Sequence, residues 1–311
     1  MPEHARPAPP RPLDVRRLGP QAIRRELRRA GLGARHALSQ NFLADGDVLQ
    51  TIVREADAAP RRRIVEVGPG LGVLTAELLA VGAAVTAVEL DRRLVEYLRE
   101  RFRGEQKQPP GTVGSLRLIE GDVLELHPEE LAVPPYEVVA NLPYHITSPV
   151  LHLFLGAAER PERMVLMVQR EVAQRIAAPP GSMSYLSVFV QYQARVRIAF
   201  GVPATAFEPE PAVESAVIVV EPFDADDRLD PDAEDGLWRL VQASFRERRK
   251  MLHNVLARQL PLDPERVTAA LATAGIDPNR RPQTLAVGEW LALHEAFGPL
   301  RSDARGRRTE P

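Results

Sequence analysis

The chain has 311 residues, which is enough for one large or two moderate domains with a sizeable buried core. It contains no cysteine, which excludes disulfides, thiolate metal sites and a cysteine nucleophile and is compatible with a reducing cytoplasm. No apolar run approaches the roughly 20 residues that span a bilayer, so we expect no membrane segment. The net charge is only −2, so any nucleic-acid binding must come from local basic clusters.

The first 36 residues are predicted to form a flexible basic arm followed by a short helix. Residues 1–19 carry five prolines and several arginines, and they lack the apolar core of a signal peptide. A helix is expected over 21–30, ended by Gly31 and Gly33. One face of this helix is basic, with Arg24, Arg25, Arg28 and Arg29 at helical spacing. Such a face is either simply solvated or in contact with nucleic acid.

Residues 37–222 show the alternation of strands and helices that is typical of an α/β domain. Ser148 is expected to cap one helix, with Pro149 at its first position. Continuous apolar strands alternating with helices indicate a parallel sheet covered on both faces. The expected strands are 64–67, 84–90, 116–120, 136–140 and 164–168, and the expected helices are 47–56, 73–80, 92–102 and 148–156.

Two further strands, 195–200 and 216–220, are joined by a Pro-rich loop without room for a crossover helix. They are expected to pair antiparallel at the sheet edge, which gives an α/β fold with a mostly parallel seven-stranded sheet. An acidic linker over 223–235 opens a second, small all-helical domain that ends near residue 300. Its expected helices are 236–245, 250–259, 264–274 and 287–297, and a disordered tail over 301–311 follows.

Polar residues follow the ends of successive strands. After the first strand, Gly68 and Gly70 let the backbone approach a ligand at a helix N-terminus, although a tight structural turn is the alternative. Glu89 ends the second strand, about 20 residues further on, and can accept both hydroxyls of a ribose. Asp91 could do this instead, or could cap the next helix. Asp122 ends the third strand and could bind an adenine amine or be an ordinary turn aspartate.

The fourth strand runs directly into the segment Asn141-Leu142-Pro143-Tyr144. Because ligands collect at the carboxyl ends of parallel strands, these four strand ends predict a pocket for an adenosine-containing cofactor whose reactive end faces Asn141. The dinucleotide fingerprint G-x-G-x-x-G would need a glycine at Val73. S-adenosylmethionine therefore fits better than NAD, and an NAD-dependent oxidoreductase is the disfavoured alternative.

The Asn-Leu-Pro-Tyr segment carries groups that suit methylation of an adenine amine, whose lone pair is conjugated with the ring. The side-chain oxygen of Asn141 and the backbone carbonyl of Leu142 can accept the amine hydrogens, and Pro143 stiffens that carbonyl. Tyr144 offers a stacking face for a flipped base, and Phe207 can close its other side. No metal is required, because a methyl sulfonium is already reactive. The alternative is a stiff turn with a core tyrosine.

At this point the chain resembles a known family, the ribosomal RNA adenine dimethyltransferases, and most closely those that act on the bacterial small subunit. The matching segments run in family order from about residue 36 to 300, and Asn-Leu-Pro-Tyr is the most specific of them. They are Gln40-Asn41-Phe42-Leu43, Glu66 to Gly72, Glu89-Leu90-Asp91, Gly121-Asp122, Asn141 to Tyr144, Phe207 to Val217, and Phe245 to Leu252.

The resemblance implies a Rossmann-like class I methyltransferase domain over 37–222 and a helical RNA-binding domain over 223–300. It places Asn41 and Leu43 over the methionine part of S-adenosylmethionine and Gly68 beneath it. Glu89 would hold the ribose, Asp122 the cofactor adenine, and Asn141 would bridge cofactor and target. Two departures from the family pattern are the entry segment His36-Ala37-Leu38-Ser39 and Glu214, where an aspartate is usual.

Together these features predict a cytoplasmic, monomeric enzyme that dimethylates adenosines of 16S ribosomal RNA near its 3′ end, on the small ribosomal subunit during late biogenesis. RNA contact is assigned to the basic run Arg246, Arg248, Arg249 and Lys250, with a solvated helix end as the alternative. The closest rival is the related large-subunit (23S) methyltransferase of macrolide resistance. A second rival is a non-enzymatic assembly or transcription factor on the same fold.

Overall fold

The computed structural model describes residues 13, 15–33, 40–224, 228–260 and 262–299, with the side chains of Arg16 and Tyr144 excepted. Most of the expected arm over 1–19 and the expected tail over 301–311 lie outside the described residues. The chain divides into two compact units. Unit 1 contains the described residues up to Gln174 together with Ala194–Pro222, and unit 2 contains Arg175–Gln193 and the described residues from Phe223 onward.

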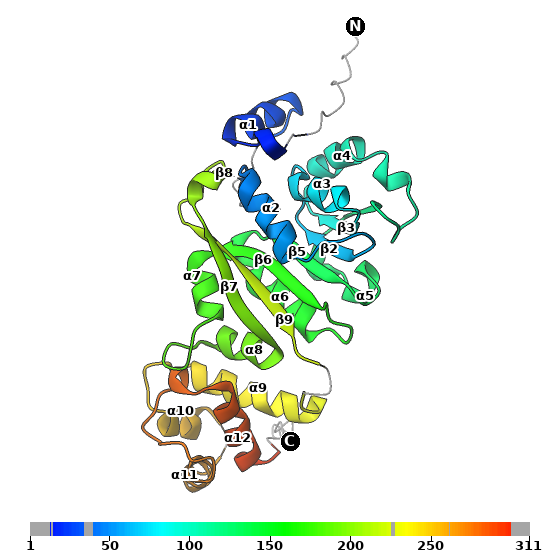
Figure 1. Cartoon of the computed structure of the whole chain (residues 1–311). Coiled ribbons are helices and arrows are strands. Elements are labelled where there is room, and N and C mark those ends of the chain that lie inside the picture. Colours follow the sequence, from blue (N-terminus) through cyan, green and yellow to red (C-terminus); the bar gives the residue numbers. More distant parts are fainter. Residues whose placement is uncertain (1–12, 14, 34–39, 225–227, 261, 300–311) are drawn as a thin grey trace, which may run out of the picture. The chain divides into compact units, whose positions relative to one another are not determined.

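Unit 1 is built on a seven-stranded sheet with the strand order β4-β3-β2-β5-β6-β9-β7 (Figure 1). The pairs from β4 to β6 are parallel, and β9 is antiparallel to both β6 and β7. The predicted α/β fold, with a mostly parallel sheet and an antiparallel edge, is therefore confirmed. The strands are β2 (Arg63–Val67), β3 (Ala84–Glu89), β4 (Leu116–Glu120), β5 (Glu137–Asn141), β6 (Arg163–Gln169), β7 (Ala194–Val202) and β9 (Ser215–Pro222).

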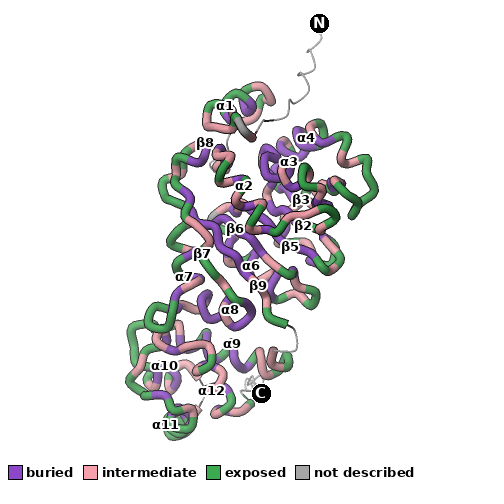
Figure 2. Tube along the Cα trace, in the orientation of Figure 1, coloured by how far each residue is buried: buried purple, intermediate pink, exposed green. Residues whose placement is uncertain are grey.

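The strand order reverses between β2 and β5, because the chain first adds β3 and β4 on one side of β2 and then β5 and β6 on the other. Right-handed crossovers place the helices before and after such a reversal on opposite faces. The central strands are consequently buried on both faces (Figure 2). Apart from an N-terminal helix, the α-helices of this unit are α2 (Gly46–Glu55), α3 (Val73–Ala80), α4 (Arg92–Arg101), α5 (Pro128–Leu131), α6 (Thr147–Gly156) and the start of α7 (Arg170–Ile176).

One local prediction in unit 1 was wrong, and one local feature was not predicted. Helix α6 begins at Thr147 rather than after a Ser148 cap, because the 3-10 turn Tyr144–Ile146 continues directly into it, and no side chain caps the helix. A second, two-stranded sheet was not predicted; in it β1 (Phe42–Leu43) pairs antiparallel with β8 (Phe207–Glu208). Strands of two residues have no periodicity to detect, so only tertiary structure shows this pairing.

The N-terminal helix α1 (Pro20–Arg29), which was expected over 21–30, belongs to unit 1. Ile23 and Leu27 are buried in the main hydrophobic core of the unit. The helix ends in a Schellman motif, in which the Leu32 amide donates to the Leu27 carbonyl at 2.8 Å and Gly31 adopts a left-handed φ of 65°. The short 3-10 turn Val15–Arg17 precedes α1.

Unit 2 consists of helices around a core that includes the fully buried Trp290. Its first complete helix lies within residues 175–193, which were predicted to belong to the methyltransferase domain. The acidic segment is also shorter than expected, because α9 starts at Pro231 and the Asp230 side chain caps it by accepting from the Ala233 amide at 3.0 Å. The helices are α8 (Tyr185–Gln193), α9 (Pro231–Phe245), α10 (Leu252–Gln259), α11 (Pro264–Thr273) and α12 (Val287–Phe297).

Candidate functional site

A pocket opens at the point where the strand order reverses, between the carboxyl ends of β2 and β5. A Cβ built on Gly68, just after β2, would lie 4.0 Å from the backbone oxygen of Asn141 at the end of β5. The register Val67↔Ala140 sets this proximity, since each strand runs on into its own loop from there. The lining includes the predicted residues Asn41, Leu43, Gly68, Gly70, Glu89, Asp122, Asn141, Leu142, Pro143 and Phe207.

The glycine loop after β2 depends on backbone that other residues adopt poorly. Gly70 has a φ of 60°, and a Cβ there would lie 3.2 Å from the Cδ1 atom of Phe42. At Gly72, the residue before α3, φ is 70° and a Cβ would lie 2.6 Å from Phe102 and 2.7 Å from Leu98. Gly72 therefore lets α3 pack closely, while Gly70 brings the pocket floor up to the Phe42 ring.

Glu89 and Asp91 have different environments, although both are buried. Glu89 lines the pocket, and its carboxylate accepts from the Gly70 amide at 3.1 Å and the Asp91 amide at 2.9 Å. Burial raises the pKa of Glu89, while these amides oppose the rise. Asp91 caps α4 and pairs with Arg93 at 2.8 Å, which lowers the pKa of its carboxyl to about 2. Asp91 thus has the capping role that the sequence left open.

Glu66 lies in the pocket, although no role was predicted for it from the sequence. It is 1% exposed, lines the pocket, and accepts a hydrogen bond from the Thr75 hydroxyl at 2.7 Å. Burial raises its pKa to about 8, and the nearby carboxyl of Glu89 adds to the rise. The signal that could have revealed it was a single acidic residue inside the apolar strand β2, where an ionisable side chain is costly unless it serves a site.

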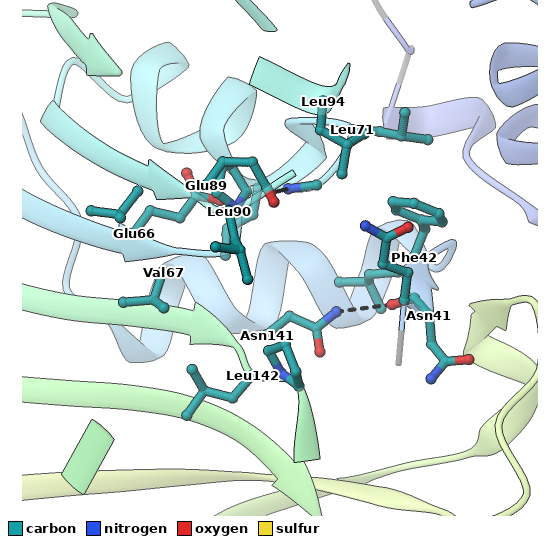
Figure 3. Close-up of a pocket in the computed structure, with 18 of the residues that line it drawn as sticks. Asn41, Phe42, Glu66, Val67, Leu71, Glu89, Leu90, Leu94, Asn141 and Leu142 are labelled. Carbon is teal, nitrogen blue, oxygen red and sulfur yellow. Dashed lines mark hydrogen bonds between the residues drawn. The ribbon is translucent and has the colours of Figure 1, made fainter. Parts of the chain in front are cut away.

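Asn141 and Asn41 lie next to each other in the pocket, and the Asn141 side chain points toward the backbone of Asn41 (Figure 3). The Nδ2 amide of Asn141 donates to the backbone carbonyl of Asn41 at 3.3 Å, which leaves the side-chain oxygen as the acceptor end of the group. Asp122 lies on the same edge and caps the 3-10 turn Val123–Glu125 by accepting from the Leu124 amide at 2.9 Å. This capping role is compatible with a position on the pocket wall.

The chain beyond Asn141 holds the other predicted catalytic residues in place. The Leu142 amide donates to the Met167 carbonyl at 3.1 Å, so the backbone of this turn is tied to β6. Pro143 fixes the next φ, at −54°. Phe207 reaches the pocket from β8, where it pairs with Leu43. The backbone of Tyr144 begins the 3-10 turn, while its side chain lies outside the described part of the chain.

The basic run predicted to contact RNA belongs to unit 2. Arg246, Arg248, Arg249 and Lys250 lie in the turn between α9 and α10, and Arg246 donates to the Gln259 side chain at 3.1 Å. The basic face of α1 is partly used within unit 1, because Arg24 pairs with Glu208 and Arg29 with Glu26. The residues that the structure describes include no cluster of three or more acidic or histidine side chains suited to a metal ion. No helix among them is long and apolar enough to cross a membrane.

The doubly wound sheet, with a glycine loop and acidic side chains at its switch point, defines a Rossmann-like methyltransferase fold. Comparison with known proteins gives the family. The family model of the ribosomal RNA adenine dimethylases matches residues 31–298, and the chain belongs to this family. The chain therefore falls among the ribosomal RNA adenine dimethyltransferases, as its motifs predicted.

Curated relatives and solved structures agree with this assignment. A ribosomal RNA small subunit methyltransferase A from Dehalococcoides mccartyi is 42% identical over 86% of this chain and 90% of its own length. A protein of the same name from Parasynechococcus marenigrum is 45% identical over 85% of this chain and 87% of its own. The 23S rRNA methyltransferase ErmE superposes with a TM-score of 0.65 at 28% identity, covering 83% of this chain and 99% of its own. A dimethyladenosine transferase from Plasmodium falciparum, at 23% identity, shares the fold with a TM-score of 0.70 over 84% of this chain and 100% of its own.

Proposed function

We propose that this protein transfers methyl groups from S-adenosylmethionine to the exocyclic amine of adenosines in 16S ribosomal RNA, near the 3′ end, giving dimethyladenosine. The observation that carries the proposal is the juxtaposition of Asn141, Leu142 and Pro143 with the glycine loop at the strand-order reversal. The names of the curated relatives support the small subunit as the substrate.

The pocket fits the cofactor by the chemistry of its walls. Two buried carboxyls, Glu66 and Glu89, suit a ligand that carries hydroxyls. The left-handed backbone at Gly68 and Gly70 gives a floor without side chains. We infer that Glu89 holds the ribose, Asp122 the adenine, and Asn41 and Leu43 the methionine end. When bound, the cofactor supplies an electrophilic methyl group.

The residues of the chain would act on the other reactant, the adenine amine. The side-chain oxygen of Asn141 and the backbone carbonyl of Leu142 accept its two hydrogens, which localises the lone pair. Pro143 keeps the carbonyl fixed. Phe207 and Tyr144 stack on the flipped base. Most of the rate would come from positioning and from these preorganised acceptors.

The proposed substrate is a late small-subunit assembly intermediate in the cytoplasm, with Arg246, Arg248, Arg249 and Lys250 neutralising RNA phosphates. Because one chain contains both the pocket and the basic run, we expect the monomer to be active. Light scattering under assay conditions tests this expectation, since activity found only in a dimer fraction would contradict it.

Methyl transfer from labelled cofactor tests the function. The substrates are unmethylated small subunits, naked 16S RNA and naked 23S RNA, with Asn141→Ala as the site variant and Gln108→Ala, an exposed loop residue, as its matched control. We expect dimethyladenosine on the small-subunit particle, lost at least ~100-fold in Asn141→Ala and retained in the control. Label on 23S RNA alone would assign the chain to the resistance branch. Binding to the particle without transfer would identify an assembly factor.

A further inference from the structure

Helix α1 contributes to the wall of the pocket, although it precedes the region matched by the family model. The match starts at residue 31, whereas α1 ends at Arg29. Ile23 lines the pocket and is 0% exposed. Ile23 belongs to the same hydrophobic cluster as Phe42 and Leu71, two other lining residues. The wall therefore depends on a helix that no motif of the sequence identified.

One anchor fixes α1 to the helix behind the proposed ribose site. The Tyr97 hydroxyl of α4 donates to Oε1 of Glu26 at 2.6 Å, and Arg29 donates to both carboxylate oxygens at 2.7 and 3.0 Å. Burial alone would raise the pKa of Glu26, but the bonds from Arg29 and Tyr97 outweigh it and hold the pKa below its usual value. A buried carboxylate satisfied in this way is a specific latch rather than a solvated charge.

The same α4 helix touches the glycine loop. Arg101, near the end of α4, donates to the Leu71 carbonyl. At its start, Asp91 caps α4 two residues after Glu89. The Glu26–Tyr97 latch therefore ties α1 to the element that follows Glu89 and supports the loop.

A second anchor reaches the opposite wall. Nε of Arg24 lies 2.8 Å from Oε2 of Glu208, whose side chain is only 17% exposed. Glu208 pairs with Phe42 across the two-stranded sheet and directly follows Phe207, the proposed stacking residue. Helix α1 thus bridges α4, on the cofactor side, and β8, on the side of the target base.

We propose that α1 is a positioning element of the site, in which the Glu26–Tyr97 latch holds Ile23 against the pocket and keeps the Phe42–Leu43 segment in its binding geometry. This inference rests on the proposed function, because it assigns α1 a role in holding S-adenosylmethionine. If only the docked form of α1 binds the cofactor well, the apparent Kd rises as the docked fraction falls.

The test measures the Kd of S-adenosylmethionine and S-adenosylhomocysteine by calorimetry on the full chain. Tyr97→Phe removes only the latch hydroxyl, Ile23→Ala removes the lining side chain, and Gln21→Ala changes an exposed residue of the same helix. We expect the Kd for both ligands to rise about 5- to 20-fold in the first two variants and to stay within about twofold in the control. The KM for cofactor should rise by a similar factor, while kcat at saturating cofactor changes less than about twofold for Tyr97→Phe.

Hydrogen exchange of the wild-type chain gives a readout that does not depend on any variant folding. Amides of residues 23–30 should become at least about fivefold more protected when cofactor saturates the site. Unchanged protection of α1, or a wild-type Kd in both Tyr97→Phe and Ile23→Ala, would overturn the inference while leaving the proposed function intact. A wild-type chain that binds neither ligand would instead overturn the proposed function.

Discussion

Glu137 allows a quantitative test of how unit 1 responds to pH. This residue starts β5, at the end of the strand away from the pocket, and it is 2% exposed. Its Oε1 lies 3.8 Å from Arg62, and within the described residues its Oε2 has no hydrogen-bond partner. Burial raises the pKa of this carboxyl from 4.5 to about 7, against the opposing effect of Arg62 and Arg163.

The sign follows from proton binding in the two states. Below pH 4.5 the carboxyl is protonated in both the folded and the unfolded chain, so it adds no pH dependence. Between 4.5 and about 7 only the unfolded chain loses the proton, and stability falls as the pH rises. Above that window the loss stays constant. At about 1.4 kcal/mol per pH unit, the pH-dependent loss between about pH 5 and 8 amounts to about 2.5 kcal/mol.

Glu137→Gln removes this titration. We compare the free energy of unfolding of the variant with that of wild type at each pH. The difference, variant minus wild type, should be about 2–2.5 kcal/mol larger at about pH 8 than at about pH 5. The side-chain amide introduced by the substitution, if it is left unsatisfied, lowers stability by a similar amount at both pH values, so the comparison between pH values isolates the proton effect. The assay is native-state hydrogen exchange of peptides from β5 at the two pH values.

The matched control is Glu125→Gln, on the turn Val123–Glu125 away from the sheet interior. The control should give the same stability difference from wild type at both pH values. A Glu137→Gln chain whose advantage does not grow between the lower and the higher pH would refute the reasoning, because it would mean that Arg62 and Arg163 already compensate the buried charge.

Three further outcomes are expected. Gly72→Ala should lower the free energy of unfolding, measured by urea titration, by about 3 kcal/mol. The reason is that residue 72 has a left-handed φ and the new Cβ would lie 2.6 Å from Phe102 and 2.7 Å from Leu98. The control Gly104→Ala, with open space around the new Cβ, should cost less than about 1 kcal/mol. Burial lowers the pKa of His294 below 6.5, so unit 2 should lose stability as the pH falls through 6.5. The fluorescence of Trp238 and Trp290, both in that unit, reports its unfolding. A His294→Gln chain whose stability changes with pH as steeply as that of wild type would contradict this expectation. Glu89→Gln should raise the Kd for S-adenosylmethionine, measured by calorimetry, about tenfold. Glu96→Gln, on the exposed side of α4, is the control. Equal affinities of Glu89→Gln and wild type would remove Glu89 from the ribose site.

The sequence by itself determined the elements and the family. The seven strands of the main sheet and the helices α2, α3, α4 and α6 were predicted to within a residue or two, because apolar runs such as Val138 to Ala140 and the 3.6-residue periodicity of the helices are local signals. Helices α5, α7 and α8 were not predicted. Strand ends also indicated the edge on which Glu89, Asp122 and Asn141 gather, since the carboxyl ends of parallel strands meet there.

Tertiary structure alone decided which distant segments touch. It placed Ile23 of α1 in the pocket wall, joined Phe42 to Glu208 in a two-residue ladder, and made Glu66 a buried acid of the site. It also separated Glu89 from Asp91, by giving Asp91 to the α4 cap and to Arg93. These features depend on burial and on pairing between parts of the chain that are far apart in sequence, and neither leaves a periodic signal in the residues themselves.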